Sequence, residues 1–398
     1  MLQSCPVYST PPSANVAPRW SATTVNSLRV PSPFPALAGT ETCLAASRSP
    51  MLREFTLQLL LSGHLMCMNI AAAGPWLCIL CEWQEARGNQ SAGQAGRHLA
   101  LLACILLVVG TLPGLVLAWM LWDHGLSGAL ARVPSRFTFA LWELLFSALL
   151  MGGHVAWWRR NPLPTRRQRR LRCLLPFLAG GNSLYHFPLL LVVLAQASRG
   201  QLQQTGILDP HFRELLLQGA VASRIGHFVL AAIAASGLAY AWCGLRCQPD
   251  PGARQLVTTG GRLALAATLL QVPVGTWVLF ELPHSAWDRL TGSDLAGSLF
   301  LWISLLASVW LLHTLTALAL GDTSRKTLYT AIWAMLIVIF LMTGALRRMS
   351  PPRVPIVTRQ PCRERPFTEA PVTHTALYPA SQLQRTVLSS PILSGVKA

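Results

Sequence analysis

The sequence predicts an all-α, polytopic transmembrane helical bundle with about eight spans. Hydrophobic residues make up 52% of the 398 residues, charged residues only 12%, and the mean hydropathy is +0.43. A soluble domain holds about 25% charged residues. The apolar residues lie in long runs, and about 20 such residues suffice to cross the hydrocarbon core of a bilayer. Because the runs are continuous rather than alternating, they predict helices and not barrel strands.

The spans follow one another through the central part of the chain, with short polar segments between them. We expect them at residues 55–81, 98–122, 137–158, 173–197, 219–245, 262–283, 293–319 and 327–346. Pro188 is expected to loosen the fourth span, and the segment Gln271–Gly275 is expected to break the sixth near its middle. Residues 258–261, which end in two glycines, are expected to form the turn before the sixth span. No internal repeat is visible.

The two ends of the chain differ from the spans in composition. Residues 1–50 and 350–398 are rich in proline, serine and threonine and predict disordered segments around a transmembrane domain at 51–349. The first segment has no basic stretch leading into an apolar run, so it does not read as a signal peptide. Met51, directly before the first span, is a candidate for the true start of the protein, which would leave the first 50 residues untranslated.

The net charge of +17 is expected to set the orientation in the lipid bilayer rather than to bind nucleic acid. Arginines are densest between Arg159 and Arg172, in the segment that joins the third and fourth spans. Basic loops stay on the cytoplasmic side of a membrane. This segment is therefore expected in the cytoplasm, with both termini outside, in a bacterial inner membrane.

Five histidines lie well inside the predicted spans. Ionisable residues at membrane depth are costly and usually functional. His64, His186 and His227 share the outer half or the midplane, and His154 and His313 lie in the inner third. Imidazoles from two helices at matching depth are common axial ligands of b-type haem. We expect His186 and His227 to be the axial ligands of one haem, with His64 as a competing ligand for the same haem. His154 and His313 are the expected ligands of a second haem. The alternative is that each histidine forms a hydrogen bond between helices.

The third span carries a polar stripe. Glu143, Ser147 and His154 fall on one face of a helix, so this face could carry protons, with Glu143 as the carrier. Two other classes of function remain open. A transporter would line a substrate path with Glu143 and Gln271, and a membrane scaffold would need no cofactor.

Two cysteine pairs end the first and fifth spans on the same predicted face. Four thiolates can hold zinc or an iron–sulfur cluster. The alternative is that membrane helices use cysteine as a small apolar residue. The four residues are Cys78, Cys81, Cys243 and Cys247.

Two segments resemble the haem-carrying subunit of cytochrome bd quinol oxidases. The sequence Ser-Arg-Phe-Thr-Phe-Ala-Leu at residues 135–141 resembles the start of one span in that family, although Phe146 stands where the family has a ligand histidine. Residues 227–237 look like its ligand-bearing helix, with His227 near the outer end. The resemblance implies haem b and quinol chemistry, although no long quinol-binding loop is evident.

Together these observations predict an integral membrane protein that binds b-type haem and takes part in electron transfer in a respiratory membrane. The expected partners are a quinone or another membrane redox subunit. Hydrolase chemistry finds no support, because the sequence has neither a P-loop nor a nucleophile elbow.

Overall fold

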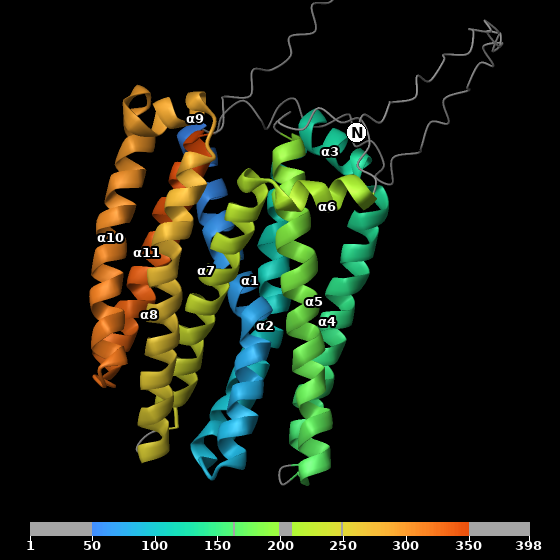
Figure 1. Ribbon diagram of the computed structural model, residues 1–398, viewed down its shortest axis with the longest axis vertical. Coiled ribbons are helices and arrows are strands. Elements are labelled where there is room, and N and C mark those ends of the chain that lie inside the picture. Colours follow the sequence, from blue (N-terminus) through green and yellow to red (C-terminus); the bar gives the residue numbers. More distant parts are fainter. Residues whose placement is uncertain (1–49, 162–163, 199–208, 248–249, 350–398) are drawn as a thin grey trace, which may run out of the picture. The chain divides into compact units, whose positions relative to one another are not determined.

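A computed structural model describes residues 50–161, 164–198, 209–247 and 250–349, all within one compact unit. The predicted fold class is confirmed, because these residues form helices and no strands, and eight of the helices are long and apolar enough to cross a membrane (Figure 1). The protein is therefore a multi-pass membrane protein. The long helices are α1 Pro50–Ala86, α2 Gln90–Met120, α4 Pro134–Arg160, α5 Arg166–Ser198, α7 Gly219–Leu245, α8 Pro251–Phe280, α10 Leu295–Ala319 and α11 Arg325–Met349.

Four of the eight long helices, α1, α2, α5 and α8, extend beyond the predicted spans by more than one turn at one end or both. The reason is capping by polar residues outside the apolar runs, which satisfies backbone N–H groups at a helix start. Asn89 accepts a hydrogen bond from the amide of Ala92 at the start of α2. Asp250 and Asp294 cap α8 and α10 in the same way.

The prolines within the spans do not interrupt the helices, which corrects two expectations. Helix α8 runs without a break through Pro273, and α5 runs through both Pro176 and Pro188. Membrane helices tolerate proline when neighbouring groups satisfy the freed carbonyls. The irregular backbone expected at Gln271–Gly275 is therefore not formed.

Three short helices, absent from the expectation, lie between the spans. They are α3 His124–Arg132, α6 Asp209–Leu217 and α9 His284–Asp288, the last followed by a π-helical turn at Arg289–Ser293. All three lie at one end of the helices, and the four short connections lie at the other end (Figure 1).

The long helices form two halves with the same order of elements. Each half has two long helices, a short one and two more long ones, namely α1 to α5 and α7 to α11. In each half the first long helix packs on the second and the fourth, and the second packs on the third. Because four spans return the chain to the same side, both halves run in the same direction. The sequence shows no such repeat, since many combinations of apolar residues maintain the same packing.

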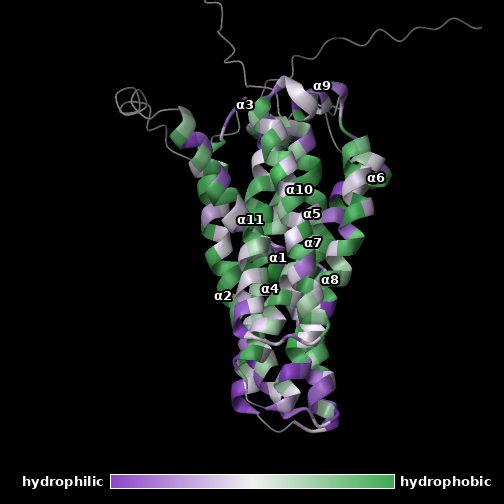
Figure 2. Cartoon of the chain, turned by 90° about the vertical axis from the view of Figure 1, so that its left-hand side faces the viewer, coloured by the Kyte–Doolittle hydropathy of each residue, from purple (hydrophilic) through white to green (hydrophobic). Residues whose placement is uncertain are grey.

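Basic residues gather at the end with the short connections. Figure 2 shows hydrophilic residues concentrated at this lower end and hydrophobic residues along the middle of the helices. The exposed arginines there include Arg159, Arg160, Arg166, Arg167 and Arg170. This distribution agrees with the predicted cytoplasmic placement of the loop between α4 and α5, and the orientation itself stays a prediction.

Candidate functional site

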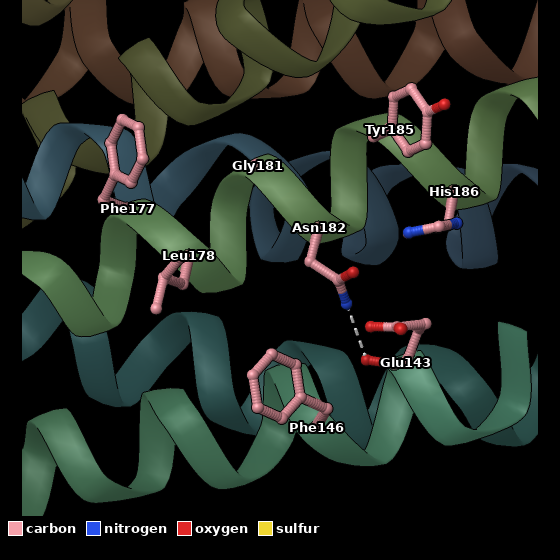
Figure 3. A pocket seen from close by; sticks show the side chains of 8 residues that line it. All are labelled: Glu143, Phe146, Phe177, Leu178, Gly181, Asn182, Tyr185 and His186. Carbon is pink, nitrogen blue, oxygen red and sulfur yellow. Dashed lines mark hydrogen bonds between the residues drawn. The ribbon is translucent and has the colours of Figure 1, made fainter. Parts of the chain in front are cut away.

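A cavity of about 420 Å³ lies between α4 and α5 and contains three polar side chains. Glu143 comes from α4, and Asn182 and His186 come from α5. Figure 3 shows the Glu143 carboxyl group and the His186 ring in the space between the two helices. At roughly 1.5 Å per residue, Glu143 lies about 14 Å from the start of α4, inside a helix long and apolar enough to cross a membrane.

Polar stripes on the two helices hold this site together. Asn182 and His186 are four residues apart on α5, as are Glu143 and Ser147 on α4, so each pair shares a helix face. The Asn182 side-chain amide donates to the Glu143 carbonyl and to the Ser147 hydroxyl, both at 2.9 Å. Ser183 adds a 3.2 Å hydrogen bond to Ser147. The predicted stripe on α4 therefore faces α5 and fixes the relative position of the two helices.

The Glu143 carboxyl group itself is the unusual feature. Among the residues that the structure describes, no side chain forms a hydrogen bond or an ion pair with it, and it interacts only electrostatically with His186. A carboxyl group at membrane depth is costly and is retained where it binds a ligand or moves protons. Glu143 is thus available to a ligand that can donate a hydrogen bond or a proton.

Aromatic side chains form the rest of the cavity. Phe146, Phe177 and Tyr185 line it and are substantially exposed, so the cavity opens at the surface of the helix bundle. The His186 ring packs edge-on against Tyr185 and Phe139, with ring centroids 4.8 and 5.3 Å apart. This arrangement suits a flat, largely apolar ring that carries polar atoms at its edge.

His64 of α1 faces α2 rather than the cavity. Its ring Nδ1 donates to the carbonyl of Gly110 at 2.7 Å. A Cβ atom at Gly114 would lie 2.7 Å from the His64 ring, so only glycine leaves room for the ring there.

His227 of α7 faces α8. Its Nδ1 atom is buried and has no hydrogen-bond partner among the described residues, and the buried hydroxyl of Ser223, one turn away, has none either. Gln271 donates to the backbone carbonyl of His227 at 3.4 Å. Gln271 therefore contacts α7 while Glu143 faces α5, so these two residues do not line one common path.

The two histidines of the inner layer lie in unlike surroundings. His154 is fully buried, donates from Nδ1 to the Arg172 carbonyl at 3.2 Å, and accepts at Nε2 from Trp158 at 3.2 Å. This pattern requires the neutral imidazole and occupies both ring nitrogens. His313 is exposed on α10, in the other half of the bundle.

The described residues therefore do not fit a haem clamped between either predicted pair of histidines. His186 faces α4, whereas His227 faces α8. In the second pair, His154 has no free ring nitrogen and His313 lies outside the packed interior. Within each layer the histidines share a depth, but their side chains do not face one another.

The four predicted cysteine ligands are unbridged, and three of them pack in the apolar core. Cys78, Cys81 and Cys243 lie in one buried hydrophobic cluster with Tyr240. Across the described part of the chain, no three His, Cys, Asp or Glu side chains are grouped to hold a metal ion. Their surroundings are those of small apolar residues.

A buried ion-pair network near the basic end was not predicted from the sequence. Arg172 of α5 is fully buried and contacts Glu82 of α1, with an NH2–Oε2 hydrogen bond of 2.6 Å. Its Nε lies 2.5 Å from Oε1 without the alignment of a hydrogen bond, so this second contact is ionic. Its guanidinium group stacks 3.6 Å from the Trp158 ring and donates to the Asn161 carbonyl.

The paired spacing of this network is visible in the sequence. Glu82 and Glu85 lie three residues apart near the end of one span, and Arg169 and Arg172 lie three residues apart near the start of another. Arg169 lies 3.7 Å from Glu82 and 3.8 Å from Glu85. Such spacing places each pair on one helix face and could have indicated the contact.

A comparison with solved structures finds a similar fold in a chain of a bd oxidase. A chain of the bd oxidase from Geobacillus thermodenitrificans aligns with a TM-score of 0.60 and 12% sequence identity, over 75% of this chain and 86% of that chain. The resemblance to a bd oxidase subunit is thus confirmed at the level of fold. No protein family matches the sequence, and neither does any curated protein.

Proposed function

We propose that the protein is a subunit of a membrane redox assembly, in a bacterial inner membrane, whose cavity between α4 and α5 binds the head group of a quinone or quinol. The observation that carries this proposal is the Glu143 carboxyl group beside His186, which has no hydrogen-bond or ion-pair partner in the described part of the chain and lies in an aromatic cavity that opens at the bundle surface. A quinone reaches such an opening from the lipid. The fold shared with a bd oxidase chain supports a place in a redox membrane.

The polar groups of the cavity match the hydrogen-bonding groups of a quinol. The Glu143 carboxylate can accept a hydrogen bond and then a proton from one hydroxyl group. His186 can bond the second ring oxygen, because an imidazole donates from one nitrogen and accepts at the other. Asn182 uses its amide N–H groups within the protein and keeps Glu143 in place.

Replacing Glu143 by leucine is expected to weaken the binding of a short-chain quinol at least tenfold. A tenfold change equals about 1.4 kcal/mol, close to the lower end of the range of about 1.5–3 kcal/mol for a hydrogen bond to a charged group. His186→Phe keeps the ring volume and is expected to have a similar effect. Binding is measured on the purified protein in detergent as the rise in melting temperature with quinol concentration.

The matched control is His313→Phe, because His313 is exposed on α10 and lies outside the cavity. This variant should bind the quinol like the wild type. Equal affinity in the wild type and in both cavity variants would show that the head group binds elsewhere or not at all.

Haem b binding is the second candidate function, and His227 is the observation that favours it. Its buried Nδ1 has no partner within the described residues, so this imidazole is available as one axial ligand. A haem would supply one-electron transfer, and the contribution of this chain would be to hold the iron from one side. The shared fold alone does not transfer the cofactors of bd oxidase to this chain.

If His227 holds a haem, the purified protein should give a reduced-minus-oxidised spectrum of the b type. His227→Ala should then remove or shift most of that signal, because loss of an axial ligand changes the spin state of the iron. His284→Ala, at the start of α9, should leave the spectrum unchanged. A folded protein without Soret absorbance after haem supplementation would end this candidate and leave the quinone proposal intact.

A further inference from the structure

A second cavity, of about 380 Å³, lies where α7 ends and α11 begins. It is lined by Trp242, Leu245, Arg246, Arg325 and Tyr329. Leu245 is buried, whereas both arginines and Tyr329 are exposed. The cavity thus has an apolar floor and a cationic opening. The end of α7 and the start of α11 lie at the end of the bundle that holds the other short connections (Figure 1).

The donors around this cavity are suited to a tetrahedral anion. A guanidinium group presents a planar fork of N–H donors that matches the oxygens of a phosphate group. The Arg246 guanidinium group lies 4.7 Å from the centre of the Trp242 ring, and this stacking limits its motion. The phenolic hydroxyl of Tyr329 adds a neutral donor beside the second arginine, Arg325.

Among the residues that the structure describes, no acidic side chain lines this cavity. The nearest carboxylates along the chain are occupied in their own loops. Asp250 contacts Ser91 and caps α8. Asp322 accepts from the Thr327 hydroxyl at 2.6 Å and from the Ser324 amide, and these hydrogen bonds hold its pKa below the ordinary value.

The corresponding place in the first half of the bundle is filled differently. There, α1 and α5 correspond to α7 and α11, and two arginines of α5, Arg169 and Arg172, are neutralised by Glu82 and Glu85 of α1. In the second half, the two arginines form no ion pair with any of the described carboxylates. Two converging positive charges therefore remain open to a ligand.

We propose that the cavity formed by Trp242, Arg246, Arg325 and Tyr329 binds a phosphate group, supplied by an anionic phospholipid head group or by free phosphate. Basic cavities between helices at the cytoplasmic side of a membrane bind anionic head groups in this way. This inference is independent of the quinone proposal, since the two cavities lie in different halves of the bundle.

The test measures thermal unfolding of the full-length protein in a neutral detergent. Dioctanoyl phosphatidylglycerol is titrated against dioctanoyl phosphatidylcholine, and inorganic phosphate against sodium chloride of equal ionic strength. Phosphatidylglycerol should stabilise the wild type. In the double variant Arg246→Gln/Arg325→Gln, the apparent Kd for phosphatidylglycerol should be at least tenfold higher. A response to phosphatidylglycerol alone identifies a lipid site, and a response to inorganic phosphate as well identifies a site for free phosphate.

The matched control is Arg159→Gln/Arg160→Gln, which removes the same charge from exposed positions at the same end. It should respond like the wild type. The single variants Arg325→Gln and Tyr329→Phe provide the same test with smaller effects if the double variant does not fold. The proposal is overturned if neither ligand stabilises the wild type, if the cavity variants respond like the wild type, or if the control loses the response equally.

Discussion

Replacing Arg172 by methionine is expected to lower the free energy of unfolding by about 3–5 kcal/mol, because the buried Glu82 carboxylate loses its buried, hydrogen-bonded counter-charge and keeps only the more distant Arg169. The Arg172 and Glu82 side chains are 0% and 1% exposed. Loss of the guanidinium group also removes its contacts with Trp158 and Asn161. The measurement is unfolding in mixed micelles with a rising fraction of sodium dodecyl sulfate, followed by tryptophan fluorescence.

Two further variants make this result specific to the ion pair. Arg170→Met removes an exposed arginine from the same helix and should change the unfolding free energy by less than about 0.5 kcal/mol. Adding Glu82→Gln to Arg172→Met should recover part of the loss, because no uncompensated charge then remains at residue 82. If Arg172→Met unfolds like Arg170→Met, the buried pair does not stabilise this end of the bundle.

The sequence predicted the spans well because lipid imposes a simple requirement. Every backbone polar group must be satisfied within the membrane, so a long apolar run leaves few alternatives to a helix. The ends of the helices were less predictable. Residues such as Asn89 and Asp250 extend helices through capping hydrogen bonds, which a hydropathy profile does not detect. The short helices α3, α6 and α9 are likewise too short and too polar to form a hydropathy signal.

The candidate site was predicted in part. Glu143 and His186 were chosen for their depth, and the structure places both in one cavity. The predicted pairing of the histidines differs from their arrangement in the structure. Depth follows from counting residues along a span, but the neighbour that a side chain faces depends on the order and rotation of the helices. His64 and His227 share a depth with His186 and nevertheless face α2 and α8.

Close packing between helices was the other feature that the amino-acid composition did not predict. Gly260 and Gly261 were expected in a turn, yet α8 begins at Pro251 and both glycines lie inside it. They face different neighbours: Gly260 approaches the backbone of α7, and Gly261 approaches Leu318 of α10. Small residues at such contacts let membrane helices approach closely, so glycine is required here for packing and not for a turn.

Replacing Gly260 by valine is accordingly expected to lower the free energy of unfolding by about 3 kcal/mol, at the upper end of the range for overpacking. A Cβ atom at this position would lie 2.5 Å from the Gly237 carbonyl oxygen and 2.8 Å from the Ala241 amide nitrogen. Both are backbone atoms of α7, so the clash cannot be relieved by rotating a side chain. The helices α7 and α8 would have to separate along a contact that holds the second half together.

Gly152→Val is the matched control, because a Cβ atom at Gly152 of α4 would meet no atom within 4 Å. The same unfolding measurement should show a change of less than about 0.5 kcal/mol for this variant. Gly260→Ala should lie between the two, since it adds the clashing Cβ atom without the branches of valine. Equal stability of Gly260→Val and Gly152→Val would mean that α7 and α8 do not approach as closely as the structure describes, whereas a graded loss would confirm that their backbones are in contact.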